Sequence, residues 1–357
     1  MSGRGDDSLL LRFLKPVDEL VSVKLLLRVW GPRFEFIVRL ILVATFLDDS
    51  YRVATQFSEH TKQVGEEGYL QSLAATSPAI VSAIATVALG IGLLAQLLGS
   101  IFLLALLHPD AATKALIGWV IAQPILYAQV TNVEFVTESL SLIGGLLILR
   151  AHLSESVHRS GRRVPLGGAS PDEAGIAPET AIAFTQLLGR LLLPAVYLYH
   201  AGLLLLSNLG YTQYRADRSL PMLAVNTAVL VGLVLGCMLV AAGLKSRTVA
   251  LSLAIISLGY VCYQHPFFSY CWREGGEWKC DEVALRKRKS MPHVVLPMEL
   301  SPRDFESWLI VDLHRYYFFH GLSTAGALML LAQFGPGAIA VEADEVLLGD
   351  MEKALNP

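Results

Sequence analysis

The chain has 357 residues, of which 54% are hydrophobic and 17% charged, and its formal net charge is −3. Soluble domains carry about 25% charged residues, so this composition, with a mean hydropathy of +0.51, excludes an ordinary soluble protein. The near-neutral charge gives no reason to expect a nucleic-acid partner. We therefore expect a protein that lies in a lipid bilayer.

The first 33 residues are rich in charge. They show no short apolar core followed by a small-residue cleavage site, so no cleavable signal peptide is expected. Within this arm, residues 8–30 alternate apolar and basic side chains. The pattern is typical of a helix that lies along a membrane surface, and a merely solvated arm is the alternative.

Apolar runs follow the arm, and a helix needs about 20 apolar residues to cross a bilayer. In chain order the runs are 34–51, 79–107, 114–131, 135–151, 187–208, 222–243, 248–266 and 316–337. The fourth run is short and opens beside Glu134 and Glu138, so seven spans is the alternative. The sequence thus predicts an all-α, polytopic membrane protein with about eight transmembrane helices.

The two halves of the chain resemble each other. The matching stretches are 38–47 (VRLILVATFL) with 189–198 (GRLLLPAVYL), and 141–151 (SLIGGLLILRA) with 323–333 (STAGALMLLAQ). In the first pair an arginine, Arg39 or Arg190, enters an apolar run, where a charge is costly. We expect two four-helix repeats, parallel because each has an even number of spans, with a binding site between them.

Lysine and arginine residues indicate the orientation. With a cytosolic N-terminus, 14 of them fall on the cytosolic side and 4 on the lumenal side, apart from 8 in the long loop 267–315. Long loops count little toward orientation, so both termini are expected in the cytosol. The expected segments are a cytosolic arm (1–33), a first repeat (34–152), a cytosolic linker (153–186), a second repeat (187–337) and a cytosolic tail (338–357).

Two of the four cysteines, Cys237 and Cys262, lie within apolar runs, where they are expected to pack. The other two, Cys271 and Cys280, flank a Gly-Gly pair in the long loop, in the stretch CWREGGEWKC. An oxidising lumen would allow them to form a disulfide. Two free thiols are the alternative, because sequence alone does not determine pairing.

Five stretches, in matching order, resemble the surfeit locus protein 4 family of endoplasmic-reticulum cargo receptors. They are TFLDDSYRVATQFSEH (45–60), GGLLILRAHLSES (144–156), LLGRLLL (187–193), GLKSRTVAL (243–251) and HRYYFFHGLSTAGALMLLAQFGPG (314–337). The resemblance covers most of residues 34–342. Each half begins with an arginine that enters an apolar run, and this start is also similar to that of the smaller DoxX-type four-helix membrane proteins. The similarity agrees with a duplication of a four-helix unit.

The first resemblance implies a receptor that binds soluble secretory proteins in the lumen and loads them into Golgi-bound vesicles formed by coat protein complex II. It implies a multi-pass protein of the endoplasmic reticulum membrane that cycles to the intermediate compartment and the cis-Golgi. It also implies recognition of short hydrophobic signals, including ones at the cargo's mature N-terminus. Homo-oligomerisation is left open.

Two features depart from the family pattern. The long loop carries an insert with the basic run RKRK at 286–289, and the chain ends in EKALNP where the family commonly has a dilysine retrieval signal. The identity of the cargo, the coat contact and the retrieval signal are therefore not predicted.

Polar and aromatic side chains gather at the expected lumenal ends of the spans, and in lipid such groups must face protein or water. The candidate cargo-binding residues are Asp48, Asp49, Arg52, Glu134, Glu138, His200, Tyr316, Phe319 and His320. Aromatic rings could hold an apolar signal, and a carboxylate could hold its α-ammonium group. The alternatives are a structural ion pair of Asp48 or Asp49 with Arg52 and an interfacial aromatic belt at 316–319.

Catalytic signatures are missing from the sequence, which has no GxSxG, HExxH, CxxC or phosphate-cradling glycine motif. His152 and His158 are too far apart for the familiar i,i+4 metal pair. We expect no enzyme, no cofactor and no metal. Two other functions stay open: a small-molecule transporter, and a DoxX-like oxidoreductase subunit, which would need histidine ligands for haem or contacts for a quinone.

Overall fold

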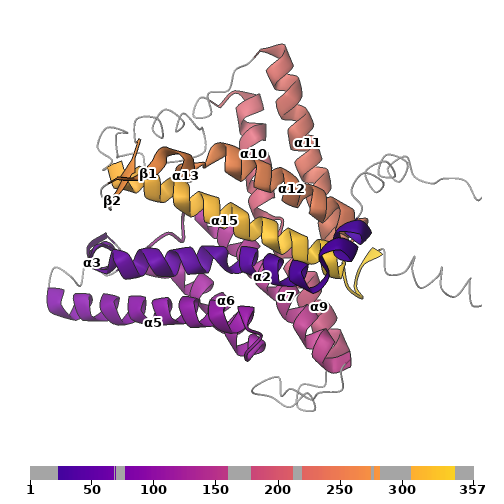
Figure 1. The fold of residues 1–357 in the computed structure, drawn as a ribbon. Helices are drawn as coiled ribbons and strands as arrows, with labels where there is room; N and C mark the ends of the chain where they lie inside the picture. Colours follow the sequence, from indigo (N-terminus) through magenta and orange to yellow (C-terminus); the bar gives the residue numbers. More distant parts are fainter. Residues whose placement is uncertain are drawn as a thin grey trace, which may run out of the picture.

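The computed structural model describes residues 23–67, 69, 77–159, 178–211, 219–274, 277–281 and 307–341. These residues are helical apart from one short hairpin and the connecting turns (Figure 1). The longer helices are α2 (Val23–Thr55), α5 (Pro78–Leu104), α6 (Pro109–Leu126), α7 (Val133–Arg159), α9 (Pro178–Leu192), α10 (Ala195–Leu209), α11 (Leu220–Ala242), α12 (Ser246–Gln264) and α15 (Ser307–Phe334). The shorter elements are α3 (Phe57–Lys62), a π-helical turn η1 (Gln63–Glu67), α13 (Phe267–Tyr270), β1 (Cys271–Glu274) and β2 (Glu277–Cys280).

Several helix boundaries follow from proline and glycine. Pro78 and Pro109 open α5 and α6, where the missing N–H costs nothing because the first turn has no partner for it. Gly210 and Gly243 end α10 and α11 with φ angles of 85° and 73°. This left-handed conformation closes a helix, and glycine adopts it without strain.

Four segments of the described chain are long and apolar enough to cross a bilayer: Pro78–Leu104, Glu179–Leu209, Leu220–Ala242 and Ser246–Tyr270. They overlap four of the runs that the sequence suggested. The chain is thus a membrane protein with several spans and a helical membrane fold. The total of eight spans remains a prediction.

Some boundaries differ from those expected. The run 187–208 is two helices, because Pro194 has no N–H to donate and separates α9 from α10. The expected loop 267–315 contains α13 and the hairpin at its start, and α15 begins within it at Ser307. Helix α7 continues to Arg159, inside the expected linker, and α2 begins at Val23, inside the expected arm.

Three expected features lie outside the described residues. They are the first 22 residues of the arm, the RKRK run at 286–289, and the tail beyond residue 341.

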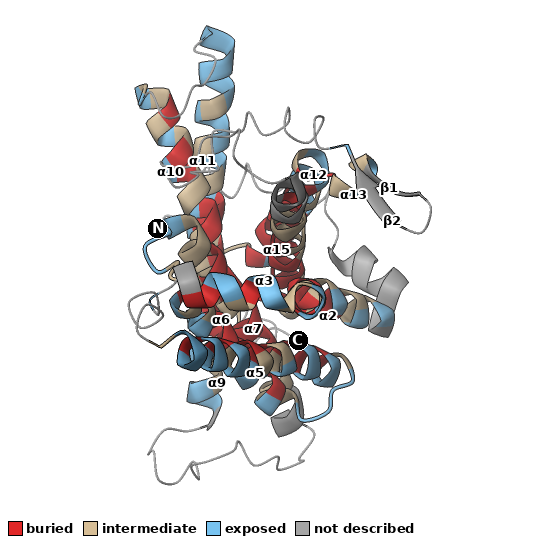
Figure 2. Ribbon diagram, turned by 90° about the vertical axis from the view of Figure 1, so that its left-hand side faces the viewer, coloured by how far each residue is buried: buried red, intermediate tan, exposed pale blue. Residues whose placement is uncertain are grey.

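The core forms where helices from both halves meet. Helix α15 packs along α2 and α12, and α7 packs along α9 (Figure 1). Their buried apolar side chains, among them Leu42, Leu146, Leu193 and Leu328, form one cluster. Buried residues gather on these central helices, whereas α5 and α11 expose long outer faces (Figure 2). Exposed apolar faces suit helices that lie against lipid.

Two glycines allow two of these helix pairs to approach closely. A Cβ atom added at Gly144 of α7 would lie 2.5 Å from the backbone nitrogen of Leu193. One added at Gly326 of α15 would lie 2.7 Å from the backbone nitrogen of Leu42. Small residues at such contacts let helix backbones come together, which is how membrane helices gain packing energy.

A serine near each glycine bonds across the same contact. The backbone N–H of Val196 donates to Ser141 Oγ (3.0 Å), and that of Thr45 donates to Ser323 Oγ (3.1 Å). Val196 lies in the first turn of α10, where backbone N–H groups have no partner within the helix. Ser323 also donates to the carbonyl of Ile41 (3.2 Å), so its hydroxyl bridges one turn of α2.

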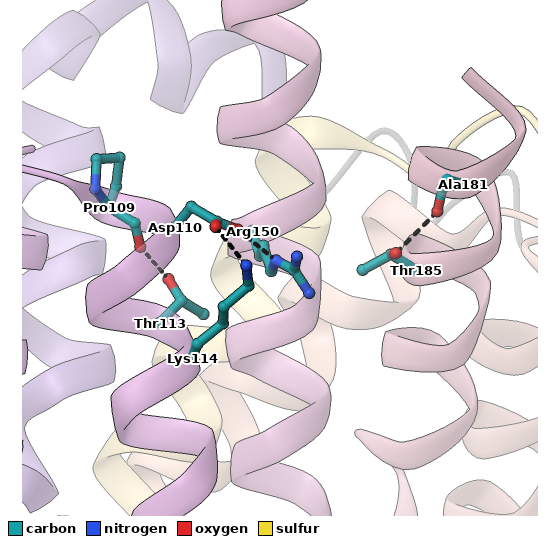
Figure 3. A network of polar contacts seen from close by, with 7 residues as sticks. All are labelled: Pro109, Asp110, Thr113, Lys114, Arg150, Ala181 and Thr185. Atoms are coloured by element: carbon teal, nitrogen blue, oxygen red, sulfur yellow. Dashed lines mark hydrogen bonds and ion pairs between the residues drawn. The ribbon is translucent and has the colours of Figure 1, made fainter. Parts of the chain in front are cut away.

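A polar network joins α6 to the far end of α7 (Figure 3). Arg150 Nε donates to Asp110 Oδ1 (2.8 Å), and Lys114 Nζ lies 2.8 Å from Asp110 Oδ2. Burial favours a higher pKa for the Asp110 carboxyl, but its contacts with Lys114 and Arg150 outweigh burial and lower the pKa. One carboxylate thus contacts a basic residue of α6 and a basic residue of α7.

The two arginines that enter apolar runs are both buried. Arg39 is 6% exposed and its Nη2 lies 3.9 Å from Glu35 Oε1, one helical turn earlier. Arg190 is 1% exposed and donates to the carbonyl of Ile339, so it ties α9 to the segment after α15. Arg39 thus lies in the middle of α2, whereas Arg190 lies in the last turn of α9.

Candidate functional site

A cavity of about 280 Å³ lies between α7, α10, α11, α12 and α15. We call six of its polar lining residues, from α7, α10, α15 and the C-terminal end of α12, the polar wall: Glu134, Glu138, His200, His265, Tyr317 and His320. We call its lining from α11 and the facing side of α12 the apolar wall: Val229, Leu233, Ile256 and Val261. The other lining residues are Val196, Tyr197, Leu204, Ser257, Tyr260, Gly321 and Thr324.

Helical spacing explains why these residues share one cavity. Glu134 and Glu138 are four residues apart at the start of α7, so they lie on the same face one turn apart. On α15 the lining positions 317, 320, 321 and 324 follow the same spacing, and so do 257 and 261 on α12. Each helix therefore presents one continuous stripe to the cavity.

Hydrogen bonds hold the polar wall in place. Tyr316 donates its hydroxyl hydrogen to Glu138 Oε2 (3.1 Å) from behind the cavity. His320 Nδ1 lies 3.1 Å from the hydroxyl of Thr45 on α2. These contacts leave Glu138 and His320 limited freedom, since both residues are more than nine-tenths buried.

Three further contacts brace α12. The ring nitrogens Nδ1 of His265 and His314 are 3.1 Å apart, so one of the two donates to the other. The His265 ring also stacks on Tyr317, with 5.4 Å between the ring centroids. Deeper in the cavity, the hydroxyl groups of Tyr197 and Ser257 are 2.7 Å apart. The end of α12 is thus fastened to α15 and its middle to α10.

The arrangement suits an amphiphilic ligand. Among the residues that the structure describes, its lining includes two carboxylates, three histidines and several hydroxyl groups, but no lysine or arginine. A cationic head could lie against Glu134 and Glu138, and an apolar body could lie against α11 and α12. Charge-assisted hydrogen bonds of this kind are about twice as strong as neutral ones.

Four of the nine predicted binding residues line the cavity: Glu134, Glu138, His200 and His320. Tyr316 does not line it but supports Glu138 from outside. The structure thus brings four of these residues together at one cavity, and their role in binding cargo stays a prediction.

The other four predicted residues lie elsewhere among the described helices. Arg315 Nε donates to Asp48 Oδ1 (2.6 Å), and Gln123 Nε2 donates to Asp49 Oδ2 (3.2 Å). The guanidinium carbon of Arg52 is 5.7 Å from the ring centre of Tyr316.

Phe319, the fourth of these residues, points to a separate aromatic group. Its ring lies 6.1 Å from that of Phe267 and 5.4 Å from that of Phe318.

Several cavity residues were not predicted, notably Tyr197, Ser257, His265 and Tyr317. Spacing could have found some of them. Tyr197 lies three residues before His200, and Tyr317 lies three residues before His320, so each shares a helix face with a predicted residue. Ser257 gave no such signal, because a serine in an apolar helix commonly bonds its own backbone.

A metal centre finds no support in the described part of the chain, where no group of three or more histidine, cysteine, aspartate or glutamate side chains is placed to hold an ion. The hairpin puts Cys271 directly opposite Cys280 in its register. Their side chains lie outside the described residues, so the disulfide stays a prediction.

Comparison with known proteins adds a family. The model of the SURF4 family matches residues 22–274. The chain is 24% identical over 313 residues to the Surfeit locus protein 4 homolog of Schizosaccharomyces pombe. This alignment covers 87% of this chain and 81% of the yeast protein. It is also 24% identical over 306 residues to the Surfeit locus protein 4 homolog of Drosophila melanogaster. This alignment covers 86% of this chain and 87% of the Drosophila protein. No solved structure matches.

Proposed function

The chain belongs to the SURF4 family, and from this membership and the cavity we propose that it is a transmembrane cargo receptor without enzymatic activity. It binds soluble secretory proteins in the lumen of the endoplasmic reticulum and loads them into vesicles bound for the Golgi. The cavity supports this function best, because it combines two carboxylates with an apolar wall inside a multi-span membrane protein.

In this proposal the N-terminus of a cargo protein enters the cavity. Its α-ammonium group has a pKa near 8 in model peptides, so it is mostly protonated at neutral pH. Glu134 and Glu138 hold this ammonium group, while the first apolar side chains pack against α11 and α12. A free N-terminus followed by apolar residues meets both needs at once.

We also propose that the membrane fold consists of two related four-helix halves. The paired stretches of sequence align Leu42 with Leu193 and Gly144 with Gly326. Each glycine lies against the leucine of the other pair: Gly144 against Leu193, and Gly326 against Leu42. Each half thus ends in a helix that packs on the first helix of the other half. This reciprocal packing supports a duplication in which a two-fold axis relates the two halves.

The remaining assignments follow from the proposed function. The protein resides in the endoplasmic reticulum membrane, cycles to the intermediate compartment and the cis-Golgi, and contacts coat protein complex II from the cytosolic side. A comparison of secreted proteins with and without this gene product, followed by crosslinking to the delayed ones, tests the function. Unchanged secretion, with nothing crosslinked, would refute it.

A binding experiment tests the site. A synthetic peptide with an apolar, free N-terminus should bind the purified full-length protein about ten- to hundred-fold more tightly than its acetylated form, because hydrogen bonds to charged groups contribute about 1.5–3 kcal/mol. Glu138→Gln should weaken binding of the free peptide by a similar factor. Combining both changes should add little, since they remove the same contact.

Asp49→Asn is the matched control, because it removes one carboxylate outside the cavity. It should leave the affinity for the free peptide unchanged. If the acetylated peptide binds the wild-type protein as tightly as the free one, Glu134 and Glu138 do not hold the cargo amine.

A further inference from the structure

The cavity has an opening between α11 and α12. The two helices are joined near Gly243 and come close where Gly236 faces Leu253, with 3.4 Å between an added Cβ and the leucine side chain. Beyond this point they diverge, and both views show α11 standing apart from α12 (Figures 1 and 2). Val229 of α11 and Ile256 of α12 line the cavity here, yet they are 47% and 64% exposed.

This opening faces hydrocarbon. Both α11 and α12 lie in segments that are long and apolar enough to span a bilayer. Their neighbouring side chains outside the cavity, Val231 and Ile255, are also half exposed and apolar. In a bilayer such side chains contact acyl chains, so the cavity is continuous with the lipid phase on this side.

An apolar surface that faces empty space loses its dispersion contacts. The apolar wall makes these dispersion contacts when a flexible hydrocarbon chain fills the cavity. The acyl chains of bilayer lipids are the flexible hydrocarbon chains available at this opening. The polar wall selects the head group. Because the described part of the lining has two carboxylates and no lysine or arginine, an ammonium head is favoured over a head with only negative charge.

We propose that the cavity takes one acyl chain of a bilayer phospholipid with an ammonium head group, which enters between α11 and α12 and places its head near Glu134 and Glu138. This inference goes beyond cargo binding and holds whether or not cargo uses the same cavity.

The test uses the full-length protein in vesicles that contain a phosphatidylethanolamine with a photoreactive group near the end of one acyl chain. After illumination, peptide mapping should place the label on cavity residues of α11, α12 or α15. Excess unlabelled phosphatidylethanolamine should remove this label from the wild-type protein. A label spread over outer faces such as that of α5, and resistant to competition, would show only general lipid contact and overturn the proposal.

Two tryptophan variants narrow the opening, Val229→Trp and Ile256→Trp. Their matched controls are Val231→Trp and Ile255→Trp, which change exposed apolar residues of the same helices outside the cavity. The first pair should lose most of the cavity label, and the control pair should keep it. Equal labelling of all four variants would overturn entry between α11 and α12.

The head group is tested with phosphatidic acid that carries the same photoreactive chain. It should label the cavity about tenfold less than phosphatidylethanolamine, and Glu134→Gln combined with Glu138→Gln should remove most of this difference. Equal labelling by both lipids in the wild-type protein would refute recognition of an ammonium head. Cargo binding is measured separately with the peptide assay, so failure of either proposal is visible on its own.

Discussion

Replacing Gly144 with alanine tests the close approach of α7 to α9. The added Cβ would lie 2.5 Å from the backbone nitrogen of Leu193, and a backbone atom cannot rotate away as a side chain can. The two helices must therefore separate. Overpacking of this kind typically costs about 1–3 kcal/mol. Gly326→Ala should behave in the same way, because its Cβ would lie 2.7 Å from the backbone nitrogen of Leu42.

A control variant separates this clash from helix propensity. Alanine is favoured over glycine within a helix by about 1 kcal/mol, whatever surrounds it. Gly202 of α10 and Gly259 of α12 have no atom within 4 Å of an added Cβ, so alanine there brings only the propensity gain. The difference between a contact variant and a control variant therefore isolates the clash.

The assay is thermal unfolding of the purified proteins in one detergent at one heating rate, since membrane proteins commonly unfold irreversibly. With a shift of about 2 °C per kcal/mol for a chain of this size, the Tm of Gly144→Ala should fall about 2–6 °C below that of Gly202→Ala. Equal Tm values would refute the close approach. Similar losses for Gly144→Ala and Gly326→Ala would support the two-fold relation.

Two other predictions concern the membrane orientation and the hairpin. Glycosylation acceptors engineered into 275–290 should be modified and those in 160–175 should not, because the basic residues place the second segment in the cytosol; the reverse pattern would overturn the orientation. Cys271 and Cys280 are opposite each other in the hairpin, at a spacing that a disulfide can bridge. Mass analysis under non-reducing conditions should find them linked, with a stabilisation of about 2–3 kcal/mol. Recovery of both as alkylated free thiols from intact membranes would contradict this.

The apolar runs predicted several helices closely, because in a membrane the length of a run reflects the thickness of the lipid. Helices α5, α11 and α12 lie within three residues of the expected limits. Hydropathy did not mark the break at Pro194, since the residues on both sides are apolar. It also missed the ends of α2, α7 and α15, which extend beyond the apolar runs with charged or polar residues.

The binding residues were harder to predict, because a run of polar residues does not show which way each one points. Neighbours on a helix are about 100° apart. Asp48 therefore meets Arg315 of α15 while Asp49 meets Gln123 of α6, and neither lines the cavity. Glu134 and Glu138 both line the cavity, since a spacing of four residues keeps both on one face.

The proposed duplication explains why the cavity has a mixed lining. The paired stretches, extended by a few residues, align Glu138 of α7 with His320 of α15, and Asp49 of α2 with His200 of α10. Three of these four residues line the cavity, and Asp49 lies instead in the first half, between α2 and α6. Helix α7 of the first half thus contributes a carboxylate to the cavity between the halves. Helices α10 and α15 of the second half contribute imidazole groups to the same cavity. Since α7 supplies both carboxylates and the other four lining helices follow it in the chain, neither half alone would form this site.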